Sequence, residues 1–155
     1  MDLIQIGKSV LSSCMDVKAG ESVLVITDDK KLPIGNALYQ AAKELGAEAL
    51  LMTMEPRKVS GEEPPAVVAA AMLAADVIVC PMSTSITHTK AKIAAVQAGA
   101  RIATMPGISE DMFSQGAMTA DYDVVLELTH RVTDLLSKAS TARIEKAGHV
   151  LTLDL

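Results

Sequence analysis

Aromatic residues are almost absent from this sequence. Its 155 residues include one Phe, two Tyr and no Trp, so a core has to be built from Ala, Val, Ile, Leu and Met. Clusters of Lys and Arg are missing too, and the net charge is −5 with a pI near 5.1. Without a basic patch, or aromatic side chains on which bases could stack, the sequence does not predict a nucleic-acid-binding protein.

A long apolar run is missing from the N-terminus. The N-terminal stretch MDLIQIGKSVLSSCM is interrupted by Asp2, Gln5 and Lys8, so it fits neither a signal peptide nor a membrane-spanning helix. We therefore expect a cytoplasmic protein with reduced thiols. In that setting Cys14 and Cys80 are expected to be small core residues rather than a disulfide or a reactive thiol.

The usual signatures of nucleotide, nucleophile and metal sites are absent. The first strand–helix turn, TDDKKLPIG, lacks the glycines that cradle a pyrophosphate, and no serine lies in a G-x-S-x-G elbow. Asp28 and Asp29 in that turn could hold a cation, although solvated loop carboxylates are the simpler interpretation. His88, His130 and His149 lie in three different segments without ligand spacing, and the last two are expected at the surface. The sequence therefore predicts no catalytic, cofactor-binding or metal-binding residue in this chain.

What the sequence does contain is a regular alternation of short apolar runs and helical segments. Strands are expected at 22–27, 48–54, 76–82 and 101–106, and helices at 3–14, 32–47, 66–75, 90–100 and 109–113. Runs that are apolar on both faces are typical of parallel strands covered by helices on each side. The expected fold is α/β: a three-layer α/β/α sandwich with a mostly parallel, flavodoxin/Rossmann-like sheet.

The pattern changes near the C-terminus. Residues 122–139 predict a long amphipathic helix, and ARIEKAGHVLTLDL predicts a β-hairpin around its Ala-Gly pair. A lone hairpin is marginal in water. We therefore expect an α/β domain over residues 1–140, followed at 141–155 by the start of a second, truncated, metal-binding domain. The helix carries one apolar stripe, formed by Val125, Leu128, Val132, Leu135 and Leu136.

The segment PMSTSITHTK follows the third expected strand directly. Ligands of open parallel sheets bind beyond the carboxyl ends of strands, and this segment has more hydroxyl groups than one helix cap needs. Ser85, His88 and Thr89 are therefore candidates for lining a substrate cleft. The alternative is that a hydroxyl only caps the helix. Similarly, Glu62–Glu63 before Pro64 suits a helix N-terminus, where negative charge is favoured.

Several stretches together resemble a known family. They are CMDVKAGESVLVIT, AAKELGAEALLMTM, ADVIVCPMSTSITHTKAKIAAVQAGARIATMPGISEDMF and DYDVV. They are similar to the N-terminal domain of metal-dependent aminopeptidases of the aminopeptidase T and aminopeptidase S type, the thermophilic metallo-aminopeptidases. The order and spacing of SITHTKA and GARIATMPGISEDMF are the most specific part. The resemblance runs from about residue 10 to about residue 150.

The resemblance implies a larger, two-domain, homodimeric hydrolase that removes N-terminal amino acids from peptides. Its second domain would hold two divalent metal ions, of the zinc, cobalt or manganese type. The ligands would be glutamates, histidines, an aspartate and a tyrosine, with an H-x-H-x-D motif. None of these ligands has a counterpart here, and Ala142–Leu155 matches the crossing into that domain. This chain alone is expected to be inactive.

Two alternatives stay open. The same pattern also resembles ring-cleaving dihydroxypyridine dioxygenases, in which case the parent enzyme is not a peptidase. A free-standing α/β module that binds a small ligand or a partner is the other possibility, although the absent glycine loop argues against a nucleotide ligand.

Overall fold

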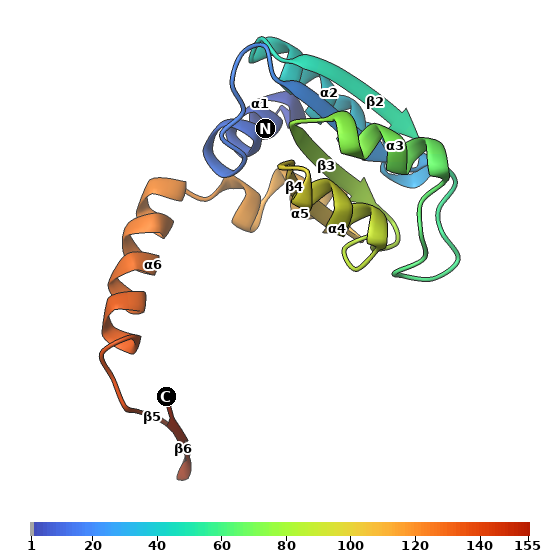
Figure 1. Ribbon diagram of the computed structural model, residues 1–155. Helices are drawn as coiled ribbons and strands as arrows, with labels where there is room; N and C mark the ends of the chain where they lie inside the picture. Colours follow the sequence, from blue (N-terminus) through green and yellow to red (C-terminus); the bar gives the residue numbers. More distant parts are fainter. Residues whose placement is uncertain (1) are drawn as a thin grey trace. The chain divides into compact units, whose positions relative to one another are not determined.

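The computed structural model describes residues 2–155, and the chain forms two compact units, Met1–Thr119 and Ala120–Leu155 (Figure 1). The predicted domain boundary between residues 140 and 141 stays a prediction. In chain order the elements are α1 (Leu3–Ser9), the π-helix η1 (Val10–Cys14), β1 (Ser22–Thr27), the 3-10 helix η2 (Asp29–Lys31), α2 (Leu32–Glu44), β2 (Glu48–Thr53), α3 (Ala66–Ala74), β3 (Val77–Met82), α4 (Lys90–Gln97), β4 (Arg101–Pro106), α5 (Glu110–Ser114), the 3-10 helix η3 (Gly116–Thr119), α6 (Tyr122–Leu136), β5 (Thr141–Lys146) and β6 (His149–Asp154).

A four-stranded parallel sheet with the order β2-β1-β3-β4 forms the centre of the first unit. Every residue of β3 is buried, as are five of the six residues of β1, because these two strands lie in the middle of the sheet. The edge strands β2 and β4 are only partly covered. The predicted α/β fold with a parallel sheet is confirmed.

Helices cover both faces of this sheet, as the ribbon shows (Figure 1). Alternate residues of a strand point to opposite faces. Val23 and Val25 of β1 therefore pack with α1, η1, α2 and α5, in a core that includes Phe113. Leu24 and Ile26 pack on the other face against α3 and α4. The chain thus builds the expected three layers with aliphatic side chains and one buried aromatic ring.

Local signals explain where the helices begin and end. Pro33 lies in the first turn of α2, and Gly46, with a φ of 81°, follows the end of that helix. Ser109 caps α5 by accepting a hydrogen bond from the Met112 N–H at 3.1 Å. At α3 the structure differs from the prediction. Its N-cap is Pro65, without a side-chain cap, so the preceding glutamates do not serve this helix.

The second unit consists of α6 and the antiparallel β5–β6 hairpin. Ala147 and Gly148 both have positive φ, 49° and 80°, as a two-residue hairpin turn of the mirror-image type requires. The predicted C-terminal hairpin is therefore confirmed. The apolar stripe of α6 is exposed in this unit, with exposed fractions from 44% at Val132 to 66% at Leu135.

The two cysteines have different environments. Cys80 is buried in β3, as expected for a small core residue, but Cys14 is exposed at the end of η1, so the core prediction is wrong for that residue. The helical spacing of the N-terminal segment continues as far as Cys14, yet the buried side of η1 is formed by Val10 and Leu11. None of the helices among the described residues has the length and apolar composition needed to cross a membrane.

Candidate functional site

The candidate site lies where β1 and β3 end. Chain order reverses between these two strands, since β2 lies on one side of β1 whereas β4 lies beyond β3. In open parallel sheets, ligands bind in the crevice outside the carboxyl ends of the strands at such a switch point. The residues that follow β1 and β3 therefore decide what this edge of the sheet can bind.

Asp28 occupies this switch point. It follows β1 and has an exposed fraction of 0%. Its carboxylate accepts hydrogen bonds from the Ser83 N–H at 2.6 Å, the Ser83 hydroxyl at 2.9 Å and the Lys30 N–H at 3.1 Å. The interpretation of Asp28 as a solvated loop carboxylate is therefore wrong. It joins the ends of the two central strands, whereas Asp29 is exposed.

The turn between β3 and α4 carries a chain of hydroxyl groups. The Ser85 hydroxyl donates to the Thr87 Oγ1 at 2.8 Å and accepts from the Thr87 N–H at 3.2 Å. Thr87 Oγ1 in turn shares a hydrogen bond of 2.9 Å with Thr104 Oγ1 of β4. All three side chains are half-buried. The hydroxyl groups noticed in the sequence thus link the β3–α4 turn to β4.

Thr89 and His88 have different surroundings. Thr89 is fully buried as the N-cap of α4: its hydroxyl donates to the Ile86 carbonyl at 2.8 Å and accepts from the Lys92 N–H at 3.2 Å. This is the capping role that sequence reasoning set beside a cleft role. His88 is exposed. The structure thus places Ser85, His88 and Thr89 in one turn at the carboxyl end of a central strand, and their role in a cleft stays a prediction.

Glu63 supplies a second cap for α4. Its carboxylate accepts hydrogen bonds from the Lys90 N–H at 2.6 Å and the Ala91 N–H at 3.1 Å. The sequence correctly suggested that an acidic residue here meets a helix N-terminus, but the helix is α4 rather than α3. Glu62 instead binds Arg57, at 2.6 Å, and the Lys58 N–H. A separation of 27 residues between Glu63 and Lys90 leaves no local pattern from which this contact could be recognised.

The two larger hollows described on the first unit are not lined by Ser85, His88 or Thr89. One, of about 410 Å³, is an apolar groove between α3 and α4; the other, of about 360 Å³, lies between the β4–α5 turn and η3. The groove is walled mainly by alanines, such as Ala69 and Ala94, with Glu63 and Lys90 at its rim. Side chains of this kind offer shape and apolar contact but no reactive group.

The described residues offer neither a cluster of metal ligands nor a reactive thiol at Cys80. Among residues 2–155, no group of three His, Cys, Asp or Glu side chains is arranged to hold a metal ion. The residues present therefore do not fit the two-metal centre that the resemblance implies. Burial raises the pKa of the Cys80 thiol to about 12, which keeps it protonated and unreactive near neutral pH.

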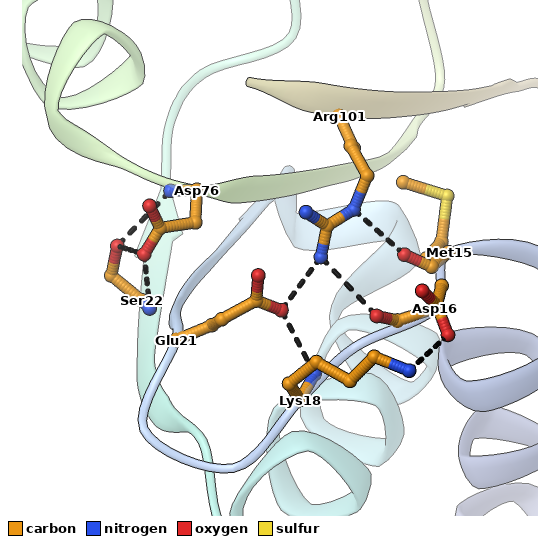
Figure 2. Close-up of polar contacts among 7 residues, drawn as sticks. All are labelled: Met15, Asp16, Lys18, Glu21, Ser22, Asp76 and Arg101. Atoms are coloured by element: carbon orange, nitrogen blue, oxygen red, sulfur yellow. Dashed lines mark hydrogen bonds and ion pairs between the residues drawn. The ribbon is translucent and has the colours of Figure 1, made fainter. Parts of the chain in front are cut away.

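The opposite, amino edge of the sheet is held by Arg101 (Figure 2). Its guanidinium donates to the Met15 carbonyl at 2.9 Å and the Asp16 carbonyl at 3.3 Å, and pairs with Glu21 at 2.6 Å. The first residue of β4 thereby fixes the loop that leads into β1. Sequence reasoning missed this network, because Arg101 is separated from these partners by 80 to 86 residues.

Carboxylates at this edge are stabilised in their charged form. The hydrogen bond from the Arg101 guanidinium lowers the pKa of Glu21, and the pairing raises the pKa of Arg101. Hydrogen bonds from the Ser22 N–H and hydroxyl, both at 2.8 Å, lower the pKa of Asp76. Figure 2 shows these groups directed at one another. We infer that the contacts at this edge stabilise the fold.

No protein-family model matches the chain, and no curated protein matches it in sequence. Its structure is similar to that of 2,5-dihydroxypyridine dioxygenase from Pseudomonas putida KT2440, with a TM-score of 0.65 and 19% sequence identity over 99% of this chain and 47% of the dioxygenase. A fatty acid ABC transporter substrate-binding protein from Thermomonospora curvata is also similar, with a TM-score of 0.52 and 17% identity over 88% of this chain and 40% of that protein.

These similarities show the fold. The match to the dioxygenase includes nearly all of this chain, so it takes in residues of both compact units. The chain spans about half the length of that dioxygenase. The chain therefore has the α/β fold of one part of a dihydroxypyridine dioxygenase.

Proposed function

We propose that this chain is a non-catalytic α/β part of a larger ring-cleaving dioxygenase that acts on a hydroxylated pyridine. The observation that carries the proposal is the similarity to 2,5-dihydroxypyridine dioxygenase, which extends over 99% of this chain and 47% of that enzyme. The substrate-binding protein has the lower TM-score. A similarity that includes the β5–β6 segment favours a two-domain parent over a free-standing ligand-binding module.

In this proposal the metal centre lies outside residues 1–155. The described residues bring together no set of metal ligands, and the Asp28 carboxylate already accepts three hydrogen bonds, from the Ser83 N–H and hydroxyl and the Lys30 N–H. The contribution of this chain is therefore structural: it holds the β3–α4 turn in place. Within that turn, the exposed His88 and half-buried Ser85 are the groups proposed to help shape a substrate cleft.

A metal-dependent aminopeptidase is the second candidate. It is supported by the order and spacing of SITHTKA and GARIATMPGISEDMF, the stretches that resemble aminopeptidases T and S. Both parents would use metal ions, but they differ in what they consume. A dioxygenase takes up dioxygen and opens an aromatic ring, whereas an aminopeptidase adds water to a peptide bond.

The two candidates are separated by assays on a longer protein that contains this chain. We expect Fe(II), the ion of many non-haem oxygenases, to support uptake of dioxygen with 2,5-dihydroxypyridine as substrate, together with loss of the ring absorbance. With zinc, cobalt or manganese we expect no release of amino acid from short peptides. Peptide hydrolysis without dioxygen uptake would reject the dioxygenase in favour of the aminopeptidase.

The proposed role of the β3–α4 turn is tested separately by His88→Ala in the longer protein. If the exposed His88 side chain shapes the cleft, its removal should lower kcat/KM while the melting temperature stays unchanged. Gln97→Ala, an exposed change at the other end of α4, is the matched control. If the activity of both variants follows only their folded fraction, His88 has no part in the cleft.

A further inference from the structure

Residues 55–63, which we call the strap, lie across the β3–α4 turn. The Gly61 N–H donates to the Ser85 carbonyl at 2.8 Å, and the Ser85 N–H donates to Ser60 Oγ at 3.2 Å. These two bonds join the strap to the turn in both directions. The strap thus contacts the segment that follows a central strand of the sheet.

The end of the strap is fixed at the start of α4. The two oxygens of Glu63 accept from the Lys90 and Ala91 N–H groups at 2.6 and 3.1 Å. Hydrogen bonds to an ionised group are stronger than those between neutral groups. Glu63 is therefore expected to be the dominant link between the strap and the rest of the protein.

Apolar burial contributes almost nothing to this link. None of residues 55–63 is buried, and the large apolar side chain of Val59 is 62% exposed. The buried residues are those that flank the strap, Met54 before it and Pro64 after it. A segment held at its two ends by the core, and between them by polar contacts alone, can open locally without disturbing the sheet.

Unsatisfied polar atoms are found in the same two segments. Arg57 Nε in the strap and Thr84 Oγ1 in the turn are the buried side-chain atoms that lack a hydrogen-bond partner among residues 2–155. Buried polar groups are normally paired, so each of these two unpaired atoms lowers the stability of the observed arrangement. A displaced strap would expose its own Arg57 Nε to water, which offsets part of the loss of the Glu63 contacts.

We propose that the strap is a movable cover that opens and closes as one unit over the β3–α4 turn, with the Glu63 carboxylate as its fastening. Opening releases four N–H groups together, because each donates a hydrogen bond between the strap and the segment it faces. The Gly61 N–H donates to the turn and the Ser85 N–H donates to the strap, whereas the Lys90 and Ala91 N–H groups of α4 donate to Glu63. This motion controls access to Ser85 whatever reaction the larger protein catalyses.

The test is amide hydrogen exchange measured by NMR on the protein and on Glu63→Ala. We expect exchange to become about tenfold faster at all four amides, since a charged acceptor is lost. The amides of Val25 and Val79, in the central strands, should be unchanged. Glu55→Ala removes an exposed carboxylate of the same strap that makes no side-chain hydrogen bond among the described residues, so it should have no effect.

Two results would overturn the proposal. If exchange accelerates only at Lys90 and Ala91, Glu63 is a local helix cap and the strap does not move as a unit. If the amides of Val25 and Val79 accelerate by the same factor as the other four, Glu63 supports global stability rather than a separate opening. Faster exchange at Gly61 and Ser85, with protection of the sheet retained, supports the cover.

Discussion

At the scale of single residues, Asp28 is the buried polar group at the centre of the candidate site. Sequence patterns placed it at the end of a strand, where a carboxylate is usually solvated or binds a cation. Its burial and its bonds to Ser83 instead make it an internal link between the two central strands. The first strand–helix turn, TDDKKLPIG, thus holds an internally bonded Asp28 and lacks the phosphate-binding glycines.

Asp28→Asn should destabilise the protein by about 1–3 kcal/mol, the cost of leaving buried hydrogen-bonding groups without a proper partner. The amide cannot accept from the Ser83 N–H and hydroxyl and the Lys30 N–H as a carboxylate does. Urea unfolding measures the change. Asp29→Asn, at the adjacent exposed position, should change the free energy of unfolding by less than about 0.5 kcal/mol. Equal stability of the two variants would contradict a buried structural role for Asp28.

Charge pairing at Arg101 predicts a dependence of stability on pH. Because the folded-state pKa of Glu21 is lowered, its ionisation stabilises the protein above its ordinary pKa, and this contribution is lost as the pH falls through the lowered value. We expect Arg101→Ala to cost about 1 kcal/mol near neutral pH, since the pair is partly exposed. The difference from the unchanged protein should shrink on acidification.

Denaturant unfolding between about pH 7 and pH 3 measures this difference. Arg131→Ala removes an exposed charge of the same kind from α6 and serves as the control. The pairing would be refuted by a difference between Arg101→Ala and the unchanged protein that stays constant over the whole range.

At the scale of elements, the close approach of α2 to the end of β1 is a further source of stability. Gly35 lies in α2, and a Cβ at this position would be 2.9 Å from Thr27 Cγ2 and 3.1 Å from Thr27 Oγ1. Thr27 is fully buried, and its hydroxyl donates to the Pro81 carbonyl at 3.0 Å, so it has little freedom to move. Glycine is therefore required by packing rather than by backbone conformation.

Gly35→Ala should lower the free energy of unfolding. The crowding of Thr27 costs about 1–3 kcal/mol, which outweighs the gain of about 1 kcal/mol that alanine brings to a helix interior. Asn36→Ala, at the next and exposed position of α2, should be neutral or slightly stabilising. Thermal unfolding of both variants tests the packing, and a more stable Gly35→Ala protein would disprove it.

The elements themselves could be predicted because their signals are local. The apolar run of β1, Gly46 after α2, Ser109 before α5 and the Ala147–Gly148 turn each lie within a few residues of what they determine. Contacts between segments could not be predicted in this way. The bonds from Ser83 to Asp28 and from Lys90 to Glu63 join residues 55 and 27 positions apart, and depend on which strands become neighbours.

At the scale of the whole molecule, the second unit exposes many large apolar side chains, and a lone hairpin is only marginally stable in water. The stripe of α6 and residues such as Ile144 and Val150 of the hairpin are about half-exposed. We propose that a homodimer, the assembly implied by the aminopeptidase resemblance, covers the α6 stripe.

A charge on the stripe should separate the subunits of this homodimer. Leu128→Glu places a carboxylate on the stripe, whereas Leu126→Glu places it on another side of α6 at a position of similar exposure, 55% against 58%. Sedimentation of the two variants should show monomers for Leu128→Glu and dimers for Leu126→Glu. The same oligomeric state for both would contradict an interface formed by the stripe.

The central claim is that this chain supports a catalytic centre without supplying its ligands. Isothermal titration calorimetry tests this claim most directly. Fe(II) and Zn²⁺ are each titrated into residues 1–155 and into a longer protein that contains these residues. The account predicts stoichiometric, tight binding by the longer protein and none by residues 1–155, in which no three potential ligands among residues 2–155 converge. Tight binding by residues 1–155 alone, or turnover of dihydroxypyridine or peptide by them, would contradict it.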